Sequence, residues 1–109
     1  MGYDVHITRS DDWADSETNP ISLEDWLEYL QRDPEMRLVG FVETRLPNGQ
    51  TLRYERPGLA AWTKQGDDST VHFDLRRGRV TVKNPDRETL AKMTAVAVGL
   101  RARVQGDDG

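Results

Sequence analysis

Cysteine is absent from the 109 residues of this chain, so the chain can form neither a disulfide bond nor a thiolate metal site. No apolar run approaches the roughly 20 residues that a membrane-spanning helix needs, and the first residues lack the basic and apolar stretches of a secretory leader. These absences lead us to expect a cytoplasmic protein. Histidine is also scarce, since the sequence contains only His6 and His72. Any imidazole chemistry therefore depends on these two residues.

The chain is acidic, with 19 aspartates and glutamates against 15 lysines and arginines and a net charge of −4. This balance disfavours a general nucleic-acid-binding protein, whose phosphate contacts need a basic field. The charges are also unevenly placed, because carboxylates dominate the start of the chain and basic residues gather later. We therefore expect a surface with an acidic part and a basic part.

The sequence pattern predicts one domain, residues 1–109, with an α+β fold. Helical periodicity predicts two helices, one from Ser22 to Asp33 and one from Asn84 to Gly99. The resulting order, β-α-β-β-β-β-β-α-β, favours a single mixed or antiparallel sheet with both helices on one face. This arrangement resembles a ferredoxin-like fold with extra meander strands. The predicted strands lie at residues 3–8, 38–46, 51–55, 59–63, 71–76, 79–83 and 101–105.

Local residues mark the ends of these elements. Ser22 is a good N-cap for the first helix, and a proline ends that helix. Asn84 is predicted to cap the second helix and Gly99 to close it. Between two strands, Asn48-Gly49 is typical of a type I′ hairpin turn. The predicted core comprises Val5, Ile7, Trp26, Leu27, Leu30, Phe73, Val80, Val82, Leu90 and Met93.

Two strands with matching alternation place both histidines among polar residues. Asp4 and His6 alternate with apolar residues in the first strand, as do His72 and Asp74 in the strand at 71–76. If these strands are neighbours, the four side chains share the open face of the sheet and could hold a divalent metal or carry out acid–base catalysis. A solvated sheet face has the same pattern, and the sequence has neither a third convergent ligand nor a His-x-x-x-His spacing. We interpret these residues as a polar face and keep a small metal-assisted hydrolase or nuclease as the alternative.

Paired aspartates occur three times, at residues 11–12, 67–68 and 107–108. Clustered carboxylates can bind Mg²⁺ or Ca²⁺, but none of these pairs lies in a loop with the EF-hand spacing. Aspartate is also a common turn residue. We therefore predict solvated turns at these positions, with no metal site and no cofactor.

A tryptophan in an acidic segment is the feature most typical of a binding surface. Trp13 either folds over the edge of the sheet as part of the core or stands out as an interface anchor, because tryptophan is enriched in binding hot spots. As an anchor it would be surrounded by Asp11, Asp12 and Asp15, which would speed the approach of a basic partner. Both interpretations stay open at this point.

Three arginines surround a glycine at residues 76–79 and predict a basic hairpin turn. Such a turn could contact phosphate, although the acidity of the whole chain weakens phosphate binding. No segment matches a P-loop, a dinucleotide fingerprint, a G-x-S-x-G elbow or an H-E-x-x-H helix. An enzyme with a nucleophilic triad is therefore disfavoured.

Three segments resemble a family of small, uncharacterised bacterial cytoplasmic proteins. They are YDVHITR at residues 3–9, ISLEDW at residues 21–26 and VQGDDG at residues 104–109. The family pattern is an N-terminal YDxHIxR strand with a C-terminal GDDG motif. The family has no known activity that the resemblance could carry over to this chain. What the resemblance implies is a role of the kind played by immunity proteins, which neutralise secreted toxins. The matching residues are Tyr3, Asp4, His6, Arg9, Trp26, Asp107 and Asp108.

These features together predict a non-enzymatic intracellular binding protein of the immunity or antitoxin-like kind, which neutralises a secreted bacterial toxin. Its expected partner is a protein, in particular a basic toxin domain. The predicted partner-binding residues are Trp13, Asp11, Asp12 and Asp15. We expect neither general nucleic-acid binding nor membrane binding.

Overall fold

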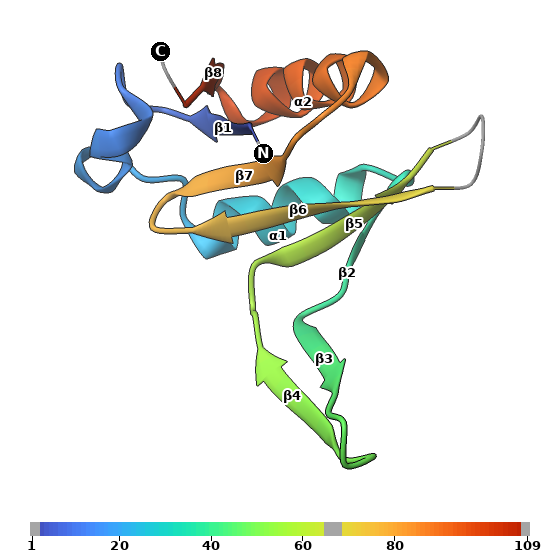
Figure 1. The fold of residues 1–109 in the computed structure, drawn as a ribbon. Coiled ribbons are helices and arrows are strands. Elements are labelled where there is room, and N and C mark those ends of the chain that lie inside the picture. The colour runs from blue at the N-terminus through green and yellow to red at the C-terminus, as the bar shows by residue number, and fades with distance from the viewer. Residues whose placement is uncertain (1–2, 65–68, 108–109) are drawn as a thin grey trace.

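The computed structural model describes residues 3–64 and 69–107, and its α+β class agrees with the prediction (Figure 1). Within these residues no helix is long and apolar enough to cross a lipid bilayer. A short 3₁₀ helix, η1, follows the first strand and has no counterpart in the predicted order. The elements in chain order are β1 (Asp4–Thr8), η1 (Trp13–Thr18), α1 (Leu23–Arg32), β2 (Met36–Leu38), β3 (Phe41–Arg45), β4 (Thr51–Glu55), β5 (Leu59–Thr63), β6 (Thr70–Arg76), β7 (Arg79–Lys83), α2 (Arg87–Leu100) and β8 (Arg103–Gly106).

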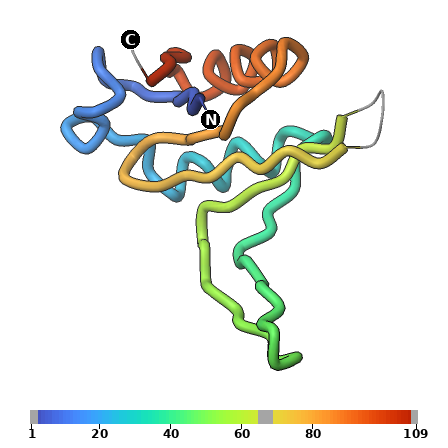
Figure 2. The backbone as a smooth tube through the Cα atoms, in the orientation of Figure 1, coloured from blue at the N-terminus to red at the C-terminus, as the bar shows by residue number. Residues whose placement is uncertain are grey.

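The main sheet has six strands in the order β2-β5-β6-β7-β1-β8, and every neighbouring pair is antiparallel. Strands β3 and β4 form a separate two-stranded sheet, and this hairpin extends away from the main sheet (Figure 2). It therefore differs from the prediction, which placed residues 38–46 and 51–55 in one continuous sheet. The strand is divided at Gly40, whose φ of +82° turns the backbone. Both Val39 and Gly40 donate their N–H groups to the Leu59 carbonyl, so pairing with β5 stops there.

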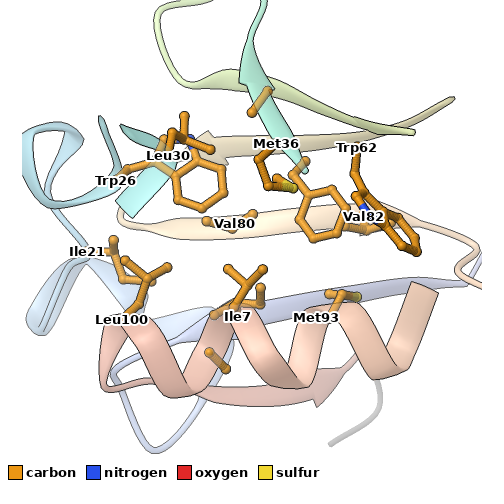
Figure 3. Close-up of a cluster of buried hydrophobic side chains, with 14 of the residues drawn as sticks. Ile7, Ile21, Trp26, Leu30, Met36, Trp62, Val80, Val82, Met93 and Leu100 are labelled. Atoms are coloured by element: carbon orange, nitrogen blue, oxygen red, sulfur yellow. The ribbon is translucent and has the colours of Figure 1, made fainter. Parts of the chain in front are cut away.

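Both helices pack on one face of the main sheet, as predicted. Figure 3 shows side chains from α1, α2 and the sheet meeting in one apolar cluster. The predicted core residues are buried except Leu27, which is partly buried, and Leu90, which is 37% exposed. The prediction for Leu90 was therefore wrong. Further buried residues of the cluster are Ile21, Met36, Ala60, Trp62, Val96, Ala97 and Leu100.

Helix α1 begins as predicted. The Ser22 hydroxyl accepts a hydrogen bond from the Asp25 N–H at 3.0 Å, which satisfies a backbone donor that the first turn leaves free. Trp26 is fully buried, and its indole N–H donates to the Gly58 carbonyl at 2.9 Å. The buried ring therefore has no unsatisfied donor, and it fixes α1 to the turn before β5.

Helix α2 begins later than predicted, because Asp86 rather than Asn84 is its N-cap. The Asp86 carboxylate accepts from the Thr89 N–H at 2.9 Å, whereas Asn84 lies outside the helix with a φ of +47°. The helix also runs through Gly99 and ends at Arg101, whose left-handed conformation delays the last strand to residue 103. Gly99 has another role, since a Cβ there would lie 2.5 Å from the Tyr29 ring of α1. It permits the close approach of the two helices.

Candidate functional site

The face of the main sheet opposite the helices carries a hollow of about 990 Å³, which we call the sheet hollow. Its floor consists of residues on β1, β6 and β7. Trp13 of η1 lines it at one end, and Phe41, Val42 and Glu43 of the hairpin line it at the other. Figure 1 shows η1 at the left, beside β1 and β7, and the hairpin below β2 and β5.

The strand register shows that both histidines project into this face. His6 pairs with Thr81 across β1 and β7, and Asp74 pairs with the same Thr81 across β6 and β7. His72 lies two residues before Asp74, so its side chain points to the same side. The prediction of a shared face is confirmed. However, β7 separates the two strands, and the offset of two residues places the histidine backbones roughly 12 Å apart.

His6 does not lie on an open face, contrary to the prediction, because η1 folds over it. The side chain is buried, and the indole of Trp13 stacks on the imidazole with ring centroids 4.1 Å apart. Its Nδ1 lies 2.9 Å from the Thr81 hydroxyl, and its Nε2 lies 2.7 Å from a carboxylate oxygen of Asp107. Both ring nitrogens are therefore engaged within the protein and neither is free for a metal or a substrate.

Trp13 folds over the sheet edge, which was one of its two predicted roles. Its backbone N–H donates to the Gln105 side chain, and its indole N–H donates to the Asp107 carbonyl at 3.2 Å. The guanidinium of Arg79 lies 5.0 Å from the centre of its ring. Trp13 is thus half-buried and held by β1, β7, β8 and the residue after β8.

Asp107 is the residue of this cluster that sequence reasoning missed as a partner of His6. The hydrogen bond from His6 lowers the pKa of its carboxyl group, as do the Asp4 N–H and the charge of Arg79. The only sequence indication of its role was its place in the predicted GDDG motif. Asp108, which follows it in the motif, lies outside the described residues, as does the pair Asp67-Asp68.

The four residues of the predicted alternative site, Asp4, His6, His72 and Asp74, all line the sheet hollow, but they do not converge on one point. Asp74 accepts a hydrogen bond from Arg56 at 2.7 Å, and it is separate from the His6–Asp107 pair. His72 is exposed on β6. In the described ranges, no group of three or more histidines and carboxylates is placed to hold a metal ion. The prediction of ordinary polar residues on a sheet face describes Asp4, His72 and Asp74 better.

The predicted partner-binding aspartates lie at η1, with Asp11 and Asp12 just before it and Asp15 within it. Asp12 is the N-cap of η1, and its carboxylate accepts from the Ala14 N–H at 3.0 Å. Asp11 has an almost fully exposed side chain, 3.4 Å from the guanidinium of Arg103. Asp15 is also exposed. These residues form an acidic edge beside the sheet hollow, with Asp12 also needed for the local fold.

The β3–β4 hairpin exposes an apolar face that sequence reasoning did not single out. Val42 pairs with Tyr54, and Thr44 pairs with Leu52, so these four side chains share one side of the ribbon. Tyr54 is 51% exposed and Leu52 is 39% exposed. We call these four residues the hairpin patch.

Comparisons with known proteins add nothing to this geometry, since no family model, curated protein or solved structure matches the chain. The resemblance carried by the segments at residues 3–9, 21–26 and 104–109 stays a prediction. A function can be inferred only from the sheet hollow, the acidic edge and the hairpin patch.

Proposed function

We propose that this protein acts by binding another protein, in the manner of an immunity protein that holds a secreted toxin inactive. The observation that carries the proposal is the hairpin patch. Strands β3 and β4 lie outside the main sheet, and every residue of β4 is exposed. The hairpin is therefore not part of the layer that covers the core.

An uncovered apolar hairpin is unfavourable for a protein that has no partner. A two-stranded hairpin is only marginally stable in water, and clustered exposed apolar residues mark interaction surfaces. Tyrosine is also among the residues that contribute most to binding energy at interfaces. Tyr54 and Leu52 offer more uncovered apolar surface than Trp13, which is stacked on His6. We therefore assign the anchoring role to the hairpin patch.

The acidic edge supports a partner with a basic surface. Exposed carboxylates raise the rate at which oppositely charged proteins meet, and they do so without being buried in the interface. Asp11, Asp12 and Asp15 are exposed and are not shielded by the hairpin. In this proposal they accelerate the encounter, and the hairpin patch provides most of the binding energy.

The alternative of a metal-assisted hydrolase has no comparable support. Its central residue, His6, is covered by Trp13 and engaged through both ring nitrogens. His72 lies on a separate strand and is exposed. We propose no catalytic role for these residues.

Capture of a partner from the native host tests the proposal. The tagged protein should retain a specific protein in near-equal amount, and the product of the adjacent gene is the first candidate. The double variant Leu52→Ser/Tyr54→Ser should lose that protein. The control Leu23→Ser/Val98→Ser removes two other exposed apolar side chains, both on helices, and should retain it. Equal capture by both double variants would contradict the proposal, as would failure of the wild-type protein to capture anything.

A further inference from the structure

The turn between β6 and β7 presents three arginines at one end of the sheet hollow. Arg76 and Arg79 are cross-strand partners, so both side chains point to the hollow side of the sheet. Arg77 and Gly78 form the turn with φ values of 54° and 80°, as a two-residue type I′ turn requires. We call this the arginine turn.

The backbone of the arginine turn is held in place by η1 and the residues after it. The buried Ser16 donates its hydroxyl to the Arg77 carbonyl at 2.7 Å, and the Ile21 N–H donates to the Gly78 carbonyl at 2.9 Å. Ser16 also accepts a hydrogen bond from the Arg79 guanidinium at 3.0 Å. The turn is therefore fixed before any ligand binds, which lowers the entropic cost of binding.

The arginine turn makes no ion pair with the carboxylates that the structure describes. Across residues 3–64 and 69–107, no carboxylate lies within 4.0 Å of a guanidinium nitrogen of Arg76, Arg77 or Arg79. The Nε of Arg79 is buried and has no hydrogen-bond acceptor. Like charges directly opposite one another on neighbouring strands are destabilising. The charge of Arg79 does act on Asp107, but that carboxylate is already bound to His6.

We propose that the arginine turn is an anion-binding site that receives an acidic segment of the bound protein. An aspartate or glutamate carboxylate would accept hydrogen bonds from Arg76 and Arg79, in the planar paired geometry that guanidinium favours. The sheet hollow, at about 990 Å³, is large enough for a short extended segment. This anion site rests on the proposed function, because the carboxylate it binds belongs to the protein partner.

A protein carboxylate fits this site better than the backbone of a nucleic acid. The whole chain has a net charge of −4, which repels the long, continuous charge of a nucleic-acid backbone more strongly than a short acidic segment. Asp4 and Glu43 also line the sheet hollow and would face successive phosphates. A partner with an acidic segment facing the arginine turn and a basic region facing the acidic edge would match the charges of this surface.

Titration of the ¹⁵N-labelled protein with hexaglutamate at low ionic strength tests the site directly. We expect saturable changes in the arginine Nε–H resonances and in the Trp13 indole N–H resonance. The variant Arg76→Gln/Arg79→Gln should weaken the apparent affinity at least tenfold. Arg32→Gln/Arg87→Gln makes the same change of charge on the two helices and should alter the affinity less than twofold. Because Arg79 also bonds Ser16, the single variant Arg76→Gln is measured as well, and it should weaken binding without changing the melting temperature.

Three outcomes would overturn the site. The first is the absence of saturable changes, and the second is an equal loss of affinity in the two double variants. The third is a stronger response to an oligothymidylate than to hexaglutamate, which would assign the turn to nucleic acid.

The partner capture described above separates this inference from the proposed function. If the hairpin variant loses its partner but hexaglutamate does not bind, the anion site is wrong and the protein-binding function stands. If hexaglutamate binds the arginine turn but the wild-type protein captures no partner, the site stands and the function is wrong.

Discussion

His6 joins three parts of the chain that lie far apart in sequence. It belongs to β1, it bonds Thr81 of β7, and it pairs with Asp107 after β8. The indole of Trp13 covers it from the side of η1. This arrangement explains a buried histidine by packing and hydrogen bonding, because both of its nitrogens and one ring face are satisfied internally. The cluster therefore stabilises the surface next to the arginine turn.

Asp107→Asn should change how stability depends on pH. The pKa of Asp107 is lowered in the folded protein, so its carboxylate contributes stability at pH values above its unfolded pKa of about 3.9. That contribution is lost as the pH falls through the lower, folded value. The variant should be less stable than wild type near pH 6, and the difference should narrow below about pH 4. Urea unfolding of both proteins between pH 3 and pH 6 measures this, and parallel stability curves would contradict it.

Lys92 is the cation whose removal should cost the most stability. Its ammonium group lies 2.8 Å from Asp33 and 2.7 Å from Glu35, and the side chains of Lys92 and Asp33 are each only 9% exposed. Burial alone would raise the pKa of Asp33, but hydrogen bonds from Lys92 and Tyr29 outweigh it and lower the pKa. Lys92→Met leaves this carboxylate without its cation and should lower the free energy of unfolding by about 1–3 kcal/mol.

Urea denaturation at pH 7 tests the role of Lys92 against a matched control. Lys83→Met removes the same charge from an exposed position on β7 and should change the unfolding free energy by less than about 0.5 kcal/mol. Equal losses in the two variants would show that the Lys92 pair adds nothing beyond an ordinary surface charge.

Helix α2 offers two valines that differ only in where they face. Val96 is fully buried and Val98 is 75% exposed. Val96→Ala should lower the unfolding free energy by about 1.5–3 kcal/mol, because it removes two buried methyl groups and leaves a cavity. Val98→Ala should have no cost, since alanine is the better helix former. Thermal or urea unfolding of both variants measures the difference, and similar losses would mean that the buried face of α2 is wrongly assigned.

The β3–β4 hairpin should be the least protected pair of strands. Its hydrogen bonds lie outside the six-stranded sheet, and β4 is exposed along its whole length. Amide hydrogens that bridge β3 and β4 should therefore exchange with solvent faster than those between β6 and β7. Hydrogen exchange followed by NMR tests this, and addition of the captured partner should slow exchange in the hairpin. Protection of the hairpin equal to that of β6 and β7 in the free protein would contradict the prediction.

Elements defined by short-range rules were predictable, and those defined by distant contacts were not. The Ser22 cap follows from residues close in sequence, and the structure has it. The hairpin at Asn48-Gly49 is also present, but its predicted type I′ turn is wrong: the Gly49 N–H donates to the Leu46 carbonyl at 2.9 Å, and Gly49 has a positive φ of 87° whereas Asn48 does not. Asn84 and Asp86 are both good capping residues, so local preference alone did not decide where α2 begins. The departure of β3 from the sheet depends on Gly40 and its contact with Leu59, which alternation does not show.

The candidate site could be predicted only in part for the same reason. Alternation in β1 and β6 gave the shared face of His6 and His72 correctly. It did not show that Asp107 pairs with His6, because these residues lie 101 positions apart. It also did not show that η1 covers His6, because Trp13 of η1 is held there by hydrogen bonds to the distant Gln105 and Asp107. The hairpin patch was also missed, since its apolar residues look like ordinary strand residues until the strand leaves the sheet.

At the scale of the whole molecule, an acidic region and a basic region lie next to each other. The acidic edge lies on η1, and the arginine turn is hydrogen-bonded to that same helix through Ser16. The predicted uneven charge is therefore present as two neighbouring regions of opposite sign. A partner that binds here must present complementary charges within a short distance, and this requirement gives selectivity as well as speed.

Reversing the charge of the acidic edge should slow association with the captured partner. Asp12 is spared because it caps η1, and Asp11 because it lies near Arg103. The variant Asp15→Lys/Glu17→Lys changes Asp15 of the acidic edge and Glu17, a second exposed carboxylate of η1. It should lower the association rate constant roughly tenfold at low ionic strength, with little effect on dissociation. Added salt should reduce this difference, since salt screens exposed charges.

Surface-binding kinetics at two ionic strengths decide whether the position of these charges matters. Glu28→Lys/Glu88→Lys makes the same change of net charge on α1 and α2, on the side of the sheet away from the hollow. It should slow association much less, because the partner approaches the opposite face. If both reversals slow association equally, only the net charge of the protein steers the partner. If neither does, the partner meets the protein through the hairpin patch and the arginine turn without help from the acidic edge.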